Sequence, residues 1–244
     1  MGGTLYLGTS GFGYDAWMDG VFYPKDVKAA GRLSYYASVF NAVEIHYTFR
    51  RFPAESLFRG WRDQVPEGFR FAVKASARIT HVKQFADAES ETTLFCERAS
   101  LLGERLGPIL FRCPDTLPYD RELLARFLDT LPDGVAAAME FRHPSWNEAR
   151  DLLEARGVAW CMTENDDLDP ETGPLSWHPF GYLRLRRPDY SDAELGAWAG
   201  RIAAALAAGS DVHCFFKHED EAAGPRMALR LATQVEAAGG VPSS

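Results

Sequence analysis

The sequence predicts an α/β fold, a single (β/α)8 TIM-type barrel with its site at the C-terminal ends of the strands, spanning residues 1–244. Eight short apolar runs are spaced along the chain, and most of them are followed by a segment with a helical pattern. Strands that alternate with helices form a parallel sheet, and eight such units suit a chain of 244 residues. Length alone would also allow two smaller domains.

The expected strands are the eight apolar runs, at residues 5–8, 42–47, 70–75, 108–113, 135–141, 158–162, 182–185 and 211–217. The expected helices lie at residues 33–40, 55–64, 89–106, 121–131, 147–156, 193–208 and 226–238. The sixth and seventh strands are joined by residues 163–179, which are acidic, rich in proline and without a helical period. This segment is therefore expected to be a long irregular connection.

Capping residues support several of these helix boundaries. Asp120 can cap the helix that follows it, and Ser145 with Glu148 and Ser191 with Glu194 have the spacing of capping boxes. Glycine or proline marks further boundaries at Gly157, Gly209 and Gly224–Pro225.

The fifth run ends in charged residues and is the most informative segment of the chain. Strand alternation places Glu140 and Arg142 on one face, with Met139 and Phe141 on the other. His143 follows directly, before a capped helix. The segment is therefore a βα unit with polar chemistry at its junction, although a purely structural Glu–Arg pair is the alternative.

The same alternation identifies polar residues at the other strand ends. The inward-facing set is Glu44, His46, Lys74, Ser76, Arg112, Glu140, Arg142, Glu164, Arg184, Arg186, His213 and Lys217. It holds six Arg or Lys cations and three carboxylates, and burying so many ions for stability alone is costly. The excess of cations suits a small phosphate or carboxylate ligand. Glu44 and Glu140 are candidates for general acid/base catalysis, while Glu44 and Lys74 could each instead be interior salt-bridge partners.

Loops contribute further candidates. Gly8 to Tyr14 contains three glycines that would let backbone N–H groups approach a ligand, but it matches neither a P-loop nor a dinucleotide-binding motif. Trp17, with Phe22 and Tyr23, could cover the barrel mouth or simply pack over its rim. His81 follows the Lys74 strand and is a candidate catalytic imidazole or a structural one.

Composition limits the partners. The net charge of −8 and the pI near 5.3 argue against an extended nucleic-acid surface or a membrane-binding surface. The four cysteines have no ligand spacing and are expected to be reduced and buried. The amino terminus lacks the features of a signal peptide, which predicts a cytoplasmic protein.

No cofactor is assigned from the sequence, although a divalent metal is left open. His218, Glu219 and Asp220, together with His81, Glu140 and Asp166, could supply ligands, but no compact metal-binding spacing supports them. A solvated acidic loop is the alternative for residues 219–221.

The chain resembles the DUF72, or YecE-like, family. The matching segments lie at residues 8–12 with Trp17, 22–24, 35–37, 40–45, 71–74 with Thr80–His81, 106–111, and 140–143 with Trp146. The resemblance implies a TIM-type barrel whose pocket is built by Glu44, Lys74, His81, Glu140, Arg142, His143 and Trp146. It implies no activity, because the function of the family is undefined.

Two segments depart from the family pattern. Many relatives have Tyr-x-Arg-x-His-Gly at the seventh strand, where this chain has residues 182–187, YLRLRR; Arg184 carries over but the histidine does not. The end of the eighth strand, FFKHED at residues 215–220, replaces an Asn-rich one. The ligand could therefore differ within the family.

The sequence leaves several functions open. The first is an enzyme, a hydrolase or lyase, acting on a small phosphorylated or anionic sugar-like or nucleotide-like compound. Glu140 would act as base, Glu44 or His81 as acid, and the anion would be held by Arg142, Arg184 and Lys217. The substrate-binding candidates are Arg112, Arg142, His143, Trp146, Arg184, Arg186, Lys217, Tyr14 and Trp17.

Three alternatives remain beside this one. Lys74 or Lys217 could form a Schiff base in an aldolase-like reaction. A non-catalytic protein could bind anions or nucleic-acid ends, and a metal-dependent nuclease or phosphoesterase is a variant of that function.

Overall fold

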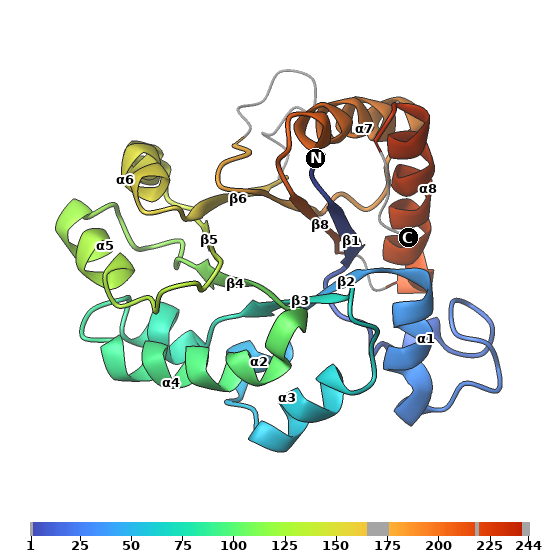
Figure 1. Ribbon diagram of the computed structural model, residues 1–244, viewed down its shortest axis with the longest axis horizontal. Coiled ribbons are helices and arrows are strands. Elements are labelled where there is room, and N and C mark those ends of the chain that lie inside the picture. Colours follow the sequence, from blue (N-terminus) through green and yellow to red (C-terminus); the bar gives the residue numbers. More distant parts are fainter. Residues whose placement is uncertain (1, 165–175, 218–219, 241–244) are drawn as a thin grey trace. The chain divides into compact units, whose positions relative to one another are not determined.

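The computed structural model describes residues 2–164, 176–217 and 220–240. The fold is the predicted (β/α)8 TIM-type barrel, with eight parallel strands in the order β1-β8-β7-β6-β5-β4-β3-β2 (Figure 1). The strands are β1 (Leu5–Thr9), β2 (Ala42–Ile45), β3 (Arg70–Lys74), β4 (Leu106–Arg112), β5 (Ala137–Glu140), β6 (Ala159–Thr163), β7 (Gly181–Leu185) and β8 (Val212–Phe216). All eight expected strands are present, with ends within two residues of those predicted.

Helices follow most of the strands, as the sequence predicts. They are α1 (Arg32–Val39), α2 (Tyr47–Arg50), α3 (Glu55–Arg62), α4 (Glu89–Ala99), α5 (Arg121–Leu128), α6 (Arg150–Ala155), α7 (Asp192–Ala207) and α8 (Ala223–Ala237). Short helical turns are η1 (Asp15–Trp17), η2 (Ala29–Gly31), η3 (Arg78–Val82), η4 (Ser100–Arg105), η5 (Pro144–Ala149) and η6 (Asp220–Ala222). None of the helices in the described ranges is both long and apolar enough to cross a bilayer.

Most of the expected caps are present. The Asp120 side chain accepts a hydrogen bond from the Leu123 N–H at 2.9 Å, and Ser191 and Glu194 form the expected capping box. The predicted cap at Ser145 is wrong, because the cap lies two residues earlier, before η5 begins at Pro144. His143 is the N-cap there, and its Nδ1 accepts from the Ser145 N–H.

The chain divides into two compact units, Met1–Glu44 with Met162–Ser244, and Ile45–Cys161. In the first, β8 pairs with β1 and with β7, and α8 contacts β1 and β8. Tyr6 and Tyr182 lie on the same face of this sheet and stack on His213, with ring centroids 4.7 and 6.2 Å away. Polar and aromatic residues thus share the face opposite the helices.

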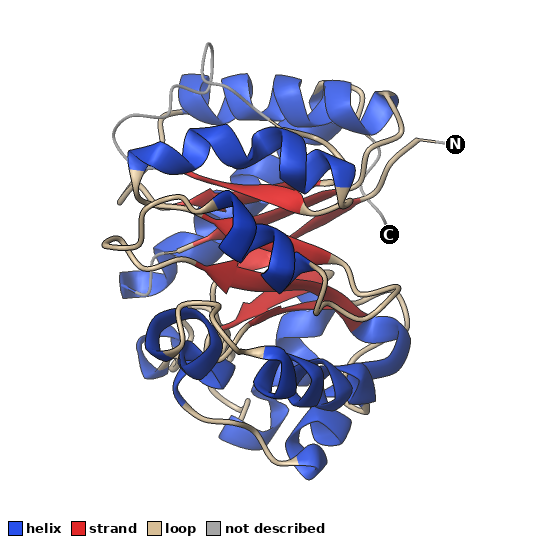
Figure 2. Ribbon diagram, turned by 90° about the vertical axis from the view of Figure 1, so that its left-hand side faces the viewer, coloured by secondary structure: helices blue, strands red, loops and turns tan. Residues whose placement is uncertain are grey.

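In the second unit, β3 pairs with β4, β4 with β5, and β5 with β6. Phe111 contacts Phe127 of α5, with ring centroids 5.1 Å apart, and Phe71 stacks on Trp61 of α3 at 6.2 Å. These apolar contacts fix the helix-facing side of the strands. Figure 2 shows the helices, in blue, outside the strands, in red.

The glycine of β1 is required by packing. A Cβ atom at Gly8 would lie 1.9 Å from the carbonyl oxygen of Ala42 and 2.6 Å from the Tyr36 hydroxyl. The sequence suggests that the glycines of this segment let the backbone approach a ligand. At Gly8 the space is instead taken by Ala42 of β2 and Tyr36 of α1. The four cysteines are free and buried, as expected.

Candidate functional site

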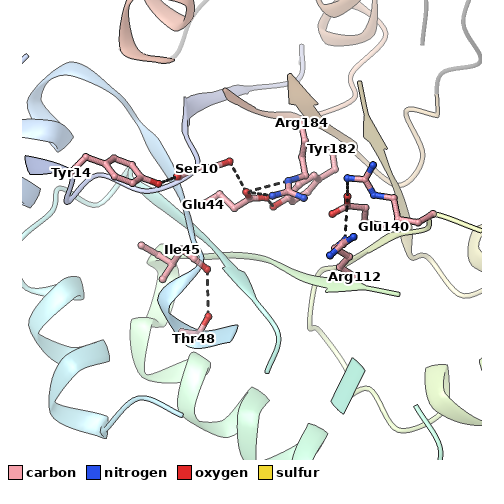
Figure 3. A network of polar contacts seen from close by, with 10 residues as sticks. Ser10, Tyr14, Glu44, Ile45, Thr48, Arg112, Glu140, Tyr182 and Arg184 are labelled. Carbon is pink, nitrogen blue, oxygen red and sulfur yellow. Dashed lines mark hydrogen bonds and ion pairs between the residues drawn. The ribbon is translucent and has the colours of Figure 1, made fainter. Parts of the chain in front are cut away.

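A buried carboxylate between two guanidinium groups is the centre of the candidate site (Figure 3). The register of β4 and β5 pairs Arg112 with Glu140. Glu140 is fully buried, and its Oε1 lies 2.6 Å from Nη2 of Arg142 and 3.8 Å from Nε of Arg112. Arg112 also reaches Oδ1 of Asp115 at 2.6 Å. The predicted Glu140–Arg142 pair is thus formed, and Arg112 joins it.

The two guanidinium groups retain hydrogen-bonding capacity. The Arg112 and Arg142 side chains are 25% and 19% exposed, while the Nε atom of each is buried. Neither Nε has a hydrogen-bond acceptor among the residues that the structure describes. The exposed nitrogen atoms of each guanidinium, rather than the buried Nε, can therefore donate hydrogen bonds to a ligand oxygen.

Lys74 and His81 meet the same aromatic ring in this unit. The Lys74 Nζ lies 3.9 Å from the ring centroid of Phe49 in α2, and the His81 ring lies edge-on to Phe49 at 5.0 Å. Burial lowers the pKa of His81, the positive charges of Arg112 and Lys74 lower it further, and Asp115 raises it. At neutral pH the His81 imidazole is therefore uncharged and can accept a proton.

His143 and Trp146 lie directly after this strand end but serve the local structure. The His143 Nδ1 lies 2.8 Å from the Ser145 Oγ, which also accepts the Tyr119 N–H at 2.8 Å. Trp146 is 1% exposed, stacks on Phe141 and donates its Nε1–H to the Leu117 carbonyl oxygen at 2.7 Å. Their roles in ligand binding stay predictions.

Glu44 is the centre of a second polar cluster, within the first unit (Figure 3). Its Oε1 accepts from the Ser10 Oγ at 2.7 Å and from Arg184 Nη2 at 3.0 Å, and its Oε2 accepts from the Tyr182 hydroxyl at 2.7 Å. Glu44 is fully buried and Arg184 is 1% exposed. These contacts are those of an interior ion pair, the alternative that the sequence leaves open for Glu44.

The remaining candidates of the first unit have mainly structural contacts. Trp17 is fully buried and packs against Tyr14, with ring centroids 4.8 Å apart. The Tyr14 hydroxyl donates to the Ser10 carbonyl oxygen at 2.5 Å. Arg186 and Lys217 are half-buried, and the Lys217 N–H donates to the Leu185 carbonyl oxygen at 3.0 Å.

The inward orientation predicted for Glu164 is wrong. Glu164 lies on the helix-facing side, where it is 1% exposed and its carboxylate contacts the Tyr190 hydroxyl, Arg187 Nε at 3.3 Å, and Trp198 of α7. Glu164 lies four residues after Trp160, so the two side chains are expected on the same side of the strand, and Trp160 packs against Arg150 of α6. Alternation along β6 therefore turns Glu164 away from the interior.

We expect Glu164→Gln to change how stability depends on pH. Burial raises the pKa of Glu164 from 4.5 to about 7, although Arg187 opposes the rise. A carboxyl whose pKa is higher in the folded chain than in the unfolded chain stabilises the fold while it is protonated. This contribution is complete at pH values below the unfolded-state pKa, and it is lost as the pH rises through the folded-state pKa. Relative to the variant, the wild-type chain should lose up to about 3 kcal/mol of unfolding free energy between pH 4.5 and 7.

Urea unfolding at pH 4.5, 6 and 8 measures this difference. Glu236→Gln is the matched control, because Glu236 is exposed on α8 of the same unit. Parallel pH curves for the wild type and Glu164→Gln would contradict the prediction.

Several contributing residues are absent from the sequence-based set. Tyr182 could have been found, because alternation places it on the face of Arg184. Phe49 could not, because the segment after β2 carries no helical signal long enough to reveal α2. Asp115 follows β4 and contacts Arg112, and only the fold brings Phe49 to His81 and Lys74.

The structure gives no support to the metal ligands considered from the sequence. Within residues 2–164, 176–217 and 220–240 no group of three or more His, Cys, Asp or Glu could hold a metal ion. Asp166, His218 and Glu219 lie outside the described residues, as does most of the connection at 163–179.

Comparisons with known proteins identify one family. Its model, the protein of unknown function DUF72, matches residues 6–243. The chain is 34% identical over 115 residues to UPF0759 protein YecE of Escherichia coli K12, covering 47% of this chain and 42% of that protein. It is 27% identical over 151 residues to UPF0759 protein YunF of Bacillus subtilis 168, covering 58% and 52%. The matches thus span about half the length of these curated relatives.

Solved structures extend this similarity over nearly the full chain. A crystal structure of a DUF72 family protein from Thermotoga maritima aligns with a TM-score of 0.80 and 26% identity. The alignment covers 96% of this chain and 99% of that one.

Proposed function

Since the chain belongs to the DUF72 family of proteins of unknown function, we propose a function from the site itself. We propose that the protein is an enzyme, a hydrolase or lyase, that acts on a small phosphorylated or otherwise anionic compound. The observation that carries this proposal is the buried Glu140 held by Arg142 and Arg112, two arginines whose side chains remain 19% and 25% exposed.

The charges around Glu140 favour an anionic ligand. Lys74, Arg112 and Arg142 supply three positive charges within one compact unit, against Glu140 and the exposed Asp115. Guanidinium groups donate paired hydrogen bonds to phosphate or carboxylate oxygens, and a partly buried site strengthens these bonds. A bound anion would bring the cluster to electrical balance.

Glu140 and His81 are the proposed acid/base groups. Glu140 is shielded from water, and the His81 imidazole is uncharged at neutral pH because its pKa is lowered. A carboxylate and a neutral imidazole can take up and return a proton during hydrolysis or elimination. In this proposal Arg112 and Arg142 hold the anion, while Glu44 fixes Arg184 in the interior.

The contacts of Lys74 do not favour the Schiff-base alternative. The Lys74 Nζ lies over the face of Phe49 at 3.9 Å, a position that stabilises a charged ammonium group. A Schiff-base lysine needs the neutral amine as nucleophile. The carbonyl chemistry considered from the sequence thus has less support than acid/base chemistry.

Titration with inorganic phosphate tests the anion site directly. Calorimetry at low ionic strength should show saturable binding to the wild-type chain, and Arg142→Gln should weaken it at least about 10-fold, since charge-assisted hydrogen bonds are lost. The control is Arg126→Gln, because Arg126 of α5 is 67% exposed and pairs with Glu122 at 3.7 Å. Turnover is then screened with phosphorylated sugars and nucleotides.

Each outcome of this experiment has a meaning. Phosphate binding that needs Arg142 but not Arg126, followed by release of product from one of the phosphorylated compounds, supports the enzyme. Equal effects of the two variants, or no binding, would refute the anion site. Binding without turnover across the screen would favour a non-catalytic anion-binding protein.

A further inference from the structure

A groove of about 380 Å³ lies beside the end of β3 and is not used by the proposed catalytic groups. It is lined by Phe52, Ser76, Arg78, Ser90, Glu91 and Leu94, all in the Ile45–Cys161 unit. Its volume is within the range of small-molecule pockets, about 300–1,000 Å³.

Two large apolar side chains are exposed in the groove. Phe52 is 41% exposed and packs edge-on against Phe95, with ring centroids 5.9 Å apart. Leu94, from the outer side of α4, is 44% exposed. Side chains of this size are costly to leave in water, and together they form a surface suited to a flat apolar group.

The charged side chains at the groove form one ion-paired cluster around Glu91. Glu91 is held by Arg78 Nε at 2.9 Å and by Lys83 Nζ at 2.8 Å, and these bonds lower the pKa of Glu91 to about 2. The Ser90 Oγ donates to the same carboxylate at 3.0 Å. Glu91 is thus ionised and only 17% exposed, and the one positive charge left over does not repel an anionic substrate. The exposed Phe52 and Leu94 side chains are the main surface that the groove offers, and they suit an uncharged apolar group.

The groove lies next to Lys74 and His81 of the proposed site along the chain. Ser76 follows Lys74 by two residues, and the Arg78 N–H lies 3.3 Å from the Ser76 Oγ. The η3 turn carries Arg78, which lines the groove, and His81, whose pKa responds to Arg112 and Lys74. The segment from Lys74 to His81 therefore connects the groove with the proposed site.

We propose that this groove is a specificity subsite that receives an uncharged aromatic ring of the substrate, whose anionic group is held by Arg112 and Arg142. This inference rests on the proposed function and names its substrate class: a small phosphate or carboxylate joined to an aromatic ring. Phe52 and Leu94 contact the ring, and the Ser76 hydroxyl is placed to bond a polar substituent.

Three probes separate the two halves of the site. Inorganic phosphate reports on the cationic cluster, benzyl alcohol on the groove, and benzyl phosphate on both together. Because one molecule engages both halves, benzyl phosphate should bind at least about 10-fold more tightly than inorganic phosphate. Calorimetry gives the affinities, and benzyl alcohol binding is followed by NMR shifts of the Phe52 ring protons, which remain in Leu94→Ser.

The variant Leu94→Ser removes apolar surface without adding charge. It should abolish the advantage of benzyl phosphate while leaving the affinity for inorganic phosphate within about twofold. Leu229→Ser is the matched control, because Leu229 on α8 is 45% exposed and lies in the other unit. Phe52→Ser should repeat the effect of Leu94→Ser from the other side of the groove.

The outcomes distinguish this inference from the proposed function. Phosphate binding with no gain for benzyl phosphate, or a gain that survives Leu94→Ser, would overturn the subsite and leave the anion site intact. The chain could instead bind benzyl alcohol in a way that depends on Leu94 and fail to bind phosphate. That result would refute the proposed function and, with it, a substrate that joins an anionic group to an aromatic ring. A gain lost in Leu94→Ser and kept in Leu229→Ser supports the proposal.

Discussion

Replacing Glu44 by alanine is expected to lower the free energy of unfolding by about 3–5 kcal/mol, the cost of leaving a buried charge without its partner. Arg184 is 1% exposed, and two of its nitrogen atoms lie 3.0 and 3.2 Å from the Glu44 Oε1. The substitution also removes the acceptor of Ser10 and Tyr182. Urea unfolding of the wild type and the variant measures the difference.

Two further variants show whether the unpaired charge is the cause. Glu236→Ala, at an exposed position of α8, should change stability by less than about 0.5 kcal/mol. The double variant Glu44→Ala with Arg184→Met removes both charges and should recover part of the loss. If Glu44→Ala alone costs less than about 1 kcal/mol, the buried ion pair does not contribute as described.

Replacing Glu140 by glutamine should lower kcat/KM by about 100- to 10,000-fold for the phosphorylated compound that the screen identifies, the range expected for loss of a general acid or base. Glutamine keeps the shape of the side chain and removes a negative charge 2.6 Å from Arg142. Affinity for inorganic phosphate should therefore be equal or higher in the variant, because less charge opposes the anion.

The opposite responses of turnover and binding make this test specific. A variant that unfolds would lose both, whereas loss of the acid/base group removes turnover alone. Glu148→Gln is the control, since Glu148 is an exposed carboxylate on the η5 turn that follows the same strand. Full turnover by Glu140→Gln would rule out the assignment of Glu140.

The strand pattern predicts the fold well because burial on both sides makes each strand an apolar run. It also predicts correctly that Glu44, Arg184 and Glu140 turn away from the helices, because alternation holds within a regular strand. The side predicted for Glu164 is wrong, although the alternation itself holds. This residue follows the last residue of β6, and counting from Trp160, whose side chain faces α6, places it on the helix side.

The composition of the candidate site is less predictable than its location. The sequence indicates that Lys74 and His81 lie near one strand end, but their common contact with Phe49 depends on the short helix α2. A helix of four residues has no period long enough to recognise. Likewise, the hydrogen bonds that the Glu44 carboxylate accepts depend on Tyr182 and Arg184, which lie 138 and 140 residues away in the sequence.

That sequence separation has a consequence for synthesis on the ribosome. Glu44 emerges early, yet its partners Tyr182 and Arg184 are made only after the whole Ile45–Cys161 segment. The segment from Ile45 to Cys161 is continuous and can begin to fold as it emerges, whereas Met1–Glu44 must wait for the last third of the chain. The Glu44 carboxylate therefore cannot reach these two partners until at least residue 184 has been made.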